Sequence, residues 1–232
     1  MALTPTHLPA VILPATIVAS AATAFWALAD SVSEHDGPAR LDPTMTADVV
    51  AHRTSAVTAA ARALTFFGSE AVVGVAALGL VVMLLERCGP RLALIVAGAM
   101  ATSAGLTVGV KMAMGRARPG GADRLGAFDS TYSFPSGHTL NSAVFLGLVC
   151  LFLVPLLRHR AIRTASYALA TAAAVGIGAS RIYLGYHWTT DVLASWTIAA
   201  VVLAVAYTVA LVLVPGGRQS GSSQVQQATV ES

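Results

Sequence analysis

Charged side chains are scarce in this sequence of 232 residues. Asp, Glu, Lys and Arg together make up 11% of the chain, which is less than half of the roughly 25% found in soluble domains. Hydrophobic residues account for 56%, and the mean hydropathy is +0.72. A soluble core of this size does not hide so much apolar surface. The scarcity of charge excludes an ordinary soluble domain and favours a protein that is integral to a membrane.

Basic clusters and cysteines are also scarce. The formal net charge is only +3, and the sequence has no run of Lys and Arg of the kind that binds nucleic acid. The two cysteines, Cys88 and Cys150, form neither a disulfide framework nor a metal-ligand spacing. We therefore expect no nucleic-acid partner, no bound metal and no other cofactor.

Long apolar runs are the main feature of the sequence. A hydrocarbon core about 30 Å thick needs about 20 helical residues, and backbone groups in lipid must be satisfied within a helix. We therefore expect an all-α, integral membrane six-helix bundle that forms a single domain over residues 1–215. A Gln/Ser/Gly-rich tail over 216–232 is expected to be disordered. The spans are expected near 8–29, 66–86, 92–112, 139–157, 164–181 and 191–214.

The first two spans have less simple interpretations. The first run resembles a signal peptide, but no Lys or Arg precedes it and it is too long for an ordinary signal sequence, so we expect a retained helix. The second run reaches membrane length only if it extends back through Glu70 to Leu64. Between them, the polar stretch over 30–62 becomes helical in pattern from Thr44 onward. We interpret it as a surface or interfacial helix.

Arginines in short loops set the expected orientation of the chain. The loops after the second and fourth spans carry Arg87, Arg91, Arg158, Arg160 and Arg163. That side, together with both termini, is expected to be cytoplasmic. The opposite side is basic as well, which opposes this assignment unless its cations have a chemical role. For Arg116 and Arg124 on that side, we expect only that they reach the membrane interface.

The first candidate motif contains Lys111, the only lysine in the chain, and Arg118, which precedes Pro119. Residues seven apart on a helix lie on nearly the same face. The two cations are therefore expected to point at one place. The alternative is that each cation reaches the membrane interface independently.

The second candidate motif is Ser136-Gly137-His138, which follows Pro135 and comes directly before the fourth span. Pro135 ends any helix upstream, and Ser136 is a favourable N-cap. A helix N-terminus with a glycine close by presents free N–H groups and binds anions. Taken alone, a serine here is more often a simple cap, and a histidine here is more often an interfacial side chain.

The third candidate motif is Arg181, His187 and Asp191 at the end of the fifth span and the start of the sixth. A spacing of four places His187 and Asp191 on one helix face. A carboxylate beside an imidazole fixes its tautomer and leaves the other ring nitrogen free as a nucleophile. The alternative is a simple ion pair at a helix end.

All three motifs lie at the same end of the expected bundle. The third and fifth spans end there, and the fourth and sixth begin there. Clustered ionisable residues at membrane helix ends are usually functional. Cations, helix N–H donors and two histidines together supply the positioning and charge stabilisation that phosphoryl transfer requires.

The motifs resemble the signatures of the type 2 phosphatidic acid phosphatase superfamily, the lipid phosphate phosphatases. The matching residues are Lys111 with Arg118-Pro119, Pro135 to His138, and Ser180-Arg181 with His187 and Asp191. Two positions depart from the common pattern: Thr189 stands where the family often has proline, and Gly120-Gly121 stands where a second Arg-Pro is common. We expect these departures to affect substrate fit more than chemistry.

The resemblance implies a role for each matching residue. His187 would attack phosphorus to form a phosphohistidine, Asp191 would orient it, and His138 would protonate the leaving group and then activate water. Family members need no metal. The residues that would hold the phosphate oxygens are Lys111, Arg118, Ser136, Gly137 and Arg181.

The resemblance also implies a membrane-bound hydrolase. Its expected substrate is a lipid phosphate such as phosphatidic acid, phosphatidylglycerol phosphate or a polyprenyl pyrophosphate. A phosphotransferase of the same fold is the main alternative, because it shares the phosphohistidine. A non-catalytic lipid transporter is a remote alternative, and the soluble haloperoxidases of the superfamily do not fit six spans. We expect a multi-pass protein of a cell membrane, specifically a bacterial inner membrane, with the active site on the outer face. The sequence leaves the oligomeric state open.

Overall fold

The computed structural model describes residues 8–214, and every regular element in that range is helical. This agrees with the all-α class expected from composition. The long helices are α1 (Leu8–Glu34), α4 (Glu70–Arg87), α5 (Pro90–Met114), α6 (Gly137–Phe152), α7 (Arg160–Tyr183) and α8 (Thr189–Leu213). The shorter elements are η1 (Gly37–Leu41), α2 (Asp42–Ala51), α3 (Ser55–Phe67), η2 (Gly121–Asp123) and η3 (Val154–Leu156). The tail expected over 216–232 lies outside the described residues.

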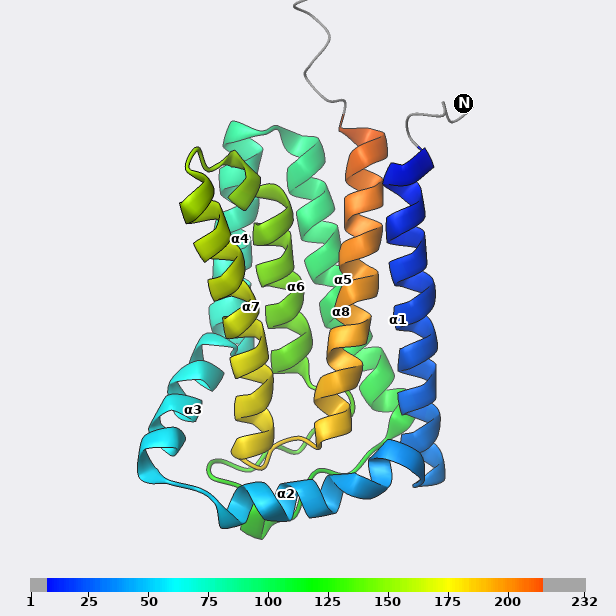
Figure 1. The fold of residues 1–232 in the computed structure, drawn as a ribbon, viewed down its shortest axis with the longest axis vertical. Coiled ribbons are helices and arrows are strands. Elements are labelled where there is room, and N and C mark those ends of the chain that lie inside the picture. The colour runs from blue at the N-terminus through cyan, green and yellow to red at the C-terminus, as the bar shows by residue number, and fades with distance from the viewer. Residues whose placement is uncertain (1–7, 215–232) are drawn as a thin grey trace, which may run out of the picture.

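The long helices run alongside one another, and α2 lies across one end of the bundle (Figure 1). The start of α1 and the end of α8 share the opposite end. At the end covered by α2, α5 and α7 finish while α6 and α8 begin. The three sequence motifs therefore lie at the same end of the bundle, as their order along the chain predicted.

Several of the helices are long and apolar enough to cross a membrane. By length and composition, α1, α5 and α8 each qualify, and so does α6 when it is continued through η3 to Leu156. The bent pair of α3 and α4 qualifies as a fifth span. The span expected over 164–181 falls within α7, which is not among those that qualify. Arg160, Arg163 and Arg181 lie in this helix and reduce its apolar character. The chain is therefore an all-helical multi-pass membrane protein, and the sixth span remains a prediction.

A bend of 45° separates α3 from α4, where the sequence predicted one continuous span over 66–86. The Ser69 hydroxyl caps α4 by accepting a hydrogen bond from the backbone N–H of Val72 at 3.4 Å. A side chain at Gly68 would collide with Cγ2 of Ile177 in α7. Gly68 allows the end of α3 to contact α7, and Ser69 begins α4 in a new direction.

The core of the bundle lies between α4, α5, α6 and α8. Its fully buried side chains include Leu84, Val96, Leu140, Val144 and Leu148. Glycines bring helices close together, since a side chain at Gly147 in α6 would collide with Leu203 in α8. Close packing of this kind is what holds helices together in lipid, where burial from water contributes little. The helices therefore form a firm support for the polar end.

Candidate active site

His187 and Asp191 form a buried pair at the start of α8. Nδ1 of His187 lies 3.2 Å from Oδ2 of Asp191, and their side chains are 2% and 0% exposed. The pair does not form on one turn of helix, as the spacing of four suggested, because α8 begins only at Thr189. Asp191 is the third residue of α8 and also accepts a hydrogen bond from the Trp188 N–H at 2.9 Å. The carboxylate thus caps the helix and contacts the imidazole at the same time.

The tautomer of His187 follows from its two neighbours. Nη1 of Arg118 lies 3.1 Å from Nε2 of His187, and a guanidinium only donates hydrogen bonds. Nε2 must therefore carry the lone pair, while Nδ1–H donates to Asp191. Burial lowers the pKa of His187 to about 4 although the Asp191 charge opposes this shift. The imidazole is neutral at pH 7, with Nε2 facing Arg118.

The negative charge of Asp191 is held by several donors. Besides His187 and Trp188, Ser133 donates through its hydroxyl to Oδ2, and Arg116 donates through Nη1 to Oδ1 at 2.6 Å. The expectation that Arg116 would only reach the membrane interface is wrong. Its side chain is 14% exposed and forms ion pairs with both Asp191 and Asp42.

Arg118 is surrounded by acceptors. Its Nε donates to the Thr131 carbonyl at 2.8 Å, its Nη1 to the Tyr186 carbonyl at 2.7 Å, and its Nη2 pairs with Asp129 at 2.6 Å. Burial alone would raise the pKa of Asp129, but hydrogen bonds from Thr131 and the Arg118 charge lower it below its usual value. The guanidinium is thus fixed beside the His187 imidazole by a carboxylate that stays ionised.

Helix α5 ends at Met114, between Lys111 and Arg118, so the two do not share a helix face. Gly115 ends α5 with a φ of +57°, a left-handed conformation that favours glycine. Lys111 lies in the last turn of α5, and its Nζ donates to the Tyr132 carbonyl. The Arg116 carbonyl accepts a hydrogen bond from the Ser133 N–H at 2.8 Å. Both ends of the 115–133 loop thereby reach the site.

The Ser136 segment begins α6 as predicted. Ser136 is the N-cap, is fully buried, and accepts hydrogen bonds from the N–H and hydroxyl of Thr139. A side chain at Gly137 would lie 3.0 Å from Cγ2 of Thr107 and 3.2 Å from Oε1 of Glu70, so there is little room for one. The N–H groups of the first turn are the ones that an α-helix leaves without internal partners.

His138 and Arg181 complete the predicted set. His138 is half-buried in the first turn of α6, and no hydrogen bond within residues 8–214 uses its ring. Arg181 is 4% exposed, stacks on the Tyr186 ring at 4.1 Å, and donates to Thr65 at 2.7 Å. Its Nε lacks a partner within the described residues. A buried cation with an unused donor is suited to an anionic ligand.

The structure adds residues that the sequence did not single out. Asp42, Ser133 and Asp129 hold the charged groups in place, and Arg124 stacks on Phe128 and Tyr186. The position of Arg116 could have been noticed in the sequence, because it lies two residues before Arg118 in the first motif. Asp42 had no such signal, because it comes from the polar segment far upstream.

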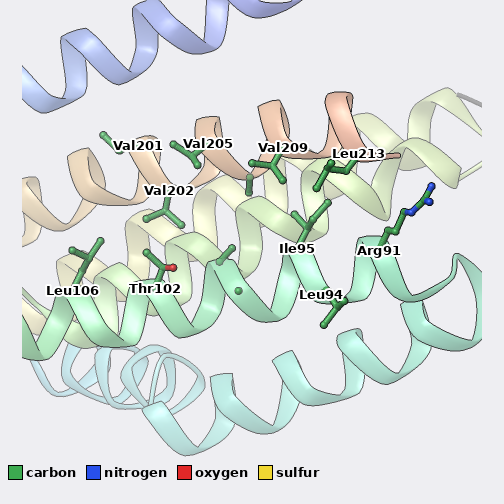
Figure 2. Close-up of a pocket in the computed structure, with 13 residues that line it drawn as sticks. Arg91, Leu94, Ile95, Thr102, Leu106, Val201, Val202, Val205, Val209 and Leu213 are labelled. Atoms are coloured by element: carbon green, nitrogen blue, oxygen red, sulfur yellow. The ribbon is translucent and has the colours of Figure 1, made fainter. Parts of the chain in front are cut away.

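The apolar groove shown in Figure 2 lies elsewhere. It has a volume of about 470 Å³ and runs between α5 and α8. Its lining includes Leu94, Ile95, Val202 and Val205, with Arg91 at one end. No residue of the three motifs contributes to it. The groove is therefore separate from the motif residues, which are gathered at the other end of α5.

Comparison with known proteins gives a family match. Residues 92–213, which contain all three motifs, match the family described as the PAP2 superfamily. The chain is 39% identical over 74 residues to phosphatidylglycerophosphatase B of Bacillus subtilis. That match covers 30% of this chain and 35% of the relative, so the chain aligns with about a third of the relative's length.

A solved structure has the same fold. It is the transmembrane PAP2 type phosphatidylglycerolphosphate phosphatase from Bacillus subtilis, with a TM-score of 0.73 and 24% sequence identity. The superposition covers 87% of this chain and 98% of that one. The likeness therefore extends over nearly the whole described bundle.

Proposed function

We propose that this chain, which belongs to the PAP2 superfamily, is a membrane lipid phosphate phosphatase that acts through a phosphohistidine on His187. The single observation that carries the proposal is the buried pair of His187 and Asp191 with Nε2 unprotonated beside Arg118. A neutral imidazole held by a carboxylate is an activated nucleophile. A guanidinium next to it is the group that a phosphoryl oxygen needs.

In the first step, the Nε2 lone pair of His187 attacks phosphorus. The N–P bond forms as the bond from phosphorus to the lipid oxygen breaks. His138, in its protonated form, gives its proton to the departing oxygen, so the lipid alcohol leaves neutral. Arg118 transfers its hydrogen bond from Nε2 to a phosphoryl oxygen as the substrate enters. Asp191 stabilises the positive charge that develops on the imidazole.

In the second step, the now neutral His138 takes a proton from water. The resulting hydroxide attacks phosphorus, the N–P bond breaks, and inorganic phosphate leaves with His187 neutral again. Each protonation state is restored, so the cycle balances without a metal. This is the metal-independent chemistry of a phosphoric ester hydrolase of this family.

Charge on the transferred phosphoryl group is stabilised by cations and helix N–H groups from four elements. The groups proposed for this role are Lys111, Arg118, Ser136, Gly137 and Arg181. The unused Nε of Arg181 supports its role. Ser136 acts through its position as the cap of α6, because its hydroxyl is buried against Thr139. Such preorganised donors supply most of the rate in phosphoryl transfer.

Phosphatidylglycerol phosphate is the substrate best supported among the candidate lipids. The names of both Bacillus subtilis proteins refer to it. We also propose that residues 1–215 form one domain in a bacterial inner membrane with α7 as its sixth span. Exposed arginines at the far end of the bundle, such as Arg87, Arg91 and Arg158, support a cytoplasmic location for that end and for the termini. The site then faces outward.

The test is phosphate release by purified protein in detergent with EDTA present. Phosphatidic acid, phosphatidylglycerol phosphate and undecaprenyl pyrophosphate serve as substrates. His187→Ala is compared with His52→Ala, an exposed histidine on the turn after α2. We expect release from phosphatidylglycerol phosphate, an unchanged rate for His52→Ala, and a loss of about 10⁶-fold for His187→Ala.

Two results would contradict the proposal. Full turnover by His187→Ala would show that His187 is not the nucleophile. If none of the three lipids released phosphate, the protein would not be the proposed hydrolase. Transfer of phosphate to an added sugar or lipid acceptor would then identify a phosphotransferase.

A further inference from the structure

A network of buried charges lies behind the His187–Asp191 pair. Arg116 is at its centre, with Nη1 donating to Oδ1 of Asp191 at 2.6 Å and Nη2 donating to Oδ2 of Asp42 at 2.7 Å. The two carboxylates are 0% and 1% exposed. One guanidinium therefore serves two buried carboxylates, and one of them is the carboxylate that contacts the nucleophile.

Asp42 connects this network to α2. It is the first residue of α2, where a negative charge is stabilised by the helix N-terminus. Oδ1 of Asp42 accepts the Thr190 N–H at 3.1 Å, and Oδ2 accepts the Thr190 hydroxyl. Nη1 of Arg116 also donates to the Thr190 hydroxyl at 2.7 Å. The start of α8, which carries Asp191, is thus fixed to the start of α2.

The energetics favour a directing role for Arg116. A carboxylate with no exposure to water stays ionised only if cations and donors compensate for lost hydration. Arg116 is the cation that contacts Asp191 on the side away from His187. Its planar, two-branched head fixes the direction of each carboxylate, which a point charge does not. Loss of this contact leaves Oδ1 of Asp191 without its cation, so that only the hydrogen bonds to Oδ2 still orient the carboxylate.

We propose that Arg116 and Asp42 are positioning residues that hold Asp191, and through it the His187 imidazole, in the orientation for attack. The interfacial helix α2 is then part of the catalytic apparatus rather than a cover over it. This inference rests on the proposed phosphatase function. It assigns neither residue a contact with the substrate.

A cavity next to Arg116 provides a direct test. It has a volume of about 320 Å³ and is lined by Arg116 together with Arg40, Asp42 and Trp188. Truncation of Arg116 to alanine enlarges this cavity toward Asp191. Free guanidinium in solution can then occupy the vacated place. Rescue by guanidinium is not expected if Arg116 only contributes to folding.

The experiment compares Arg116→Ala, Arg116→Lys and Asp42→Asn with Asp48→Asn, a control on the same helix whose side chain is 74% exposed. The soluble substrate is dioctanoyl phosphatidylglycerol phosphate. We expect Arg116→Ala to lower kcat about 100-fold with KM changed less than about threefold. Guanidinium chloride, and not sodium chloride at the same ionic strength, restores part of the loss. Arg116→Lys is intermediate, Asp42→Asn loses about tenfold, and Asp48→Asn matches the wild type.

Several outcomes would overturn the inference. One is wild-type kcat in a folded Arg116→Ala protein. Another is a kcat loss that guanidinium and sodium restore equally. If Arg116→Ala does not elute as the wild type does in size exclusion, Asp42→Asn carries the test, and wild-type kcat in that variant overturns the inference.

A substrate-free measurement separates this inference from the proposed function. The Nδ1–H proton of His187 should give a downfield resonance in ¹⁵N-histidine spectra of the wild type and of Asp48→Asn. We expect this resonance to disappear in Arg116→Ala and return with guanidinium. Failure of the wild type to release phosphate would refute the phosphatase, whereas an unchanged resonance in Arg116→Ala would refute the positioning role.

Discussion

The two ends of the helix bundle both carry arginines, but the arginines have different surroundings. At the end where α4 meets α5 and α6 meets α7, four arginines are exposed, and their side chains make no hydrogen bond or ion pair with any residue in 8–214; these are Arg87, Arg91, Arg158 and Arg160. At the opposite end, four arginines are bound to carboxylates, carbonyls or hydroxyls; these are Arg53, Arg116, Arg118 and Arg181. The same residue type is therefore exposed at one end of the bundle and held in a hydrogen-bonded, ion-paired network at the other.

The difference lies in the partners and not in the number of charges. An exposed arginine near a membrane end is compensated by water and lipid headgroups. A buried one requires acceptors in fixed positions, and these in turn fix the cation. In the sequence, the loops at both ends are basic, so loop charge alone does not distinguish the two ends. The same type of substitution should therefore change activity much more at the buried, polar end than at the exposed end.

The largest effect in this comparison is expected for Asp191. We expect Asp191→Asn to lower kcat about 10⁴-fold, because an amide does not hold the imidazole in the required tautomer or compensate its charge. Phosphate release from phosphatidylglycerol phosphate measures the loss. Asp48→Asn is the control, and a loss shared by both variants would contradict a specific role for Asp191.

The next effect compares the two ends directly. Arg181→Gln, at the polar end, should reduce kcat by about 10²–10³-fold, because it removes a preorganised donor for the phosphoryl charge. Arg91→Gln, at the other end, should change kcat less than about twofold. Both variants are assayed together in the same detergent. Equal losses would mean that the polar end is not chemically distinct.

A smaller effect concerns pH. The pKa of His187 is lowered to about 4 by burial, so acidification from pH 7 to 5 leaves the nucleophile neutral. On the acid side, we expect kcat/KM for a fixed ionic form of the substrate to fall as the pH drops through about 4. Protonation then removes the Nε2 lone pair. A loss centred near 6.5, the usual value for histidine, would show that the imidazole is not buried as described.

The smallest effect is on stability and tests the bend between α3 and α4. Gly68→Ala should destabilise the protein by about 1–3 kcal/mol, because the new methyl group meets Ile177 in α7. Gly74→Ala in α4 has open space around it and should be neutral or stabilising. Thermal melts in detergent compare the two. Equal melting temperatures would mean that α3 and α7 do not pack as closely as described.

Much of this arrangement could be predicted from the sequence. Apolar runs located the long helices, because lipid leaves helices as the natural form for such segments. The order of the spans predicted that Lys111, His138 and His187 would meet at one end. A motif that combines a cap, a glycine and a histidine is local, so local rules placed Ser136 at the start of α6.

The remainder depended on contacts that no local pattern contains. The ion pair between Asp42 and Arg116 joins residues far apart in the chain, and Asp42 belongs to none of the three motifs. The seven-residue spacing from Lys111 to Arg118 suggested one helix, but Gly115 ends α5 between them. Likewise, the spacing of four from His187 to Asp191 suggested a helical turn where the structure has a helix cap. In both cases the sequence named the residues that the structure places near one another, but it predicted the wrong backbone conformation between them.

The most direct test of the central claim is to trap the phosphorylated enzyme. Wild type, His187→Ala and His138→Ala are mixed with p-nitrophenyl [³²P]phosphate and quenched in alkali, where phosphohistidine is stable. Because nitrophenolate leaves without a proton, His138→Ala should still be phosphorylated and should accumulate the label. Peptide mapping should locate the label on His187. No label in His138→Ala, or label retained in His187→Ala, would contradict the account.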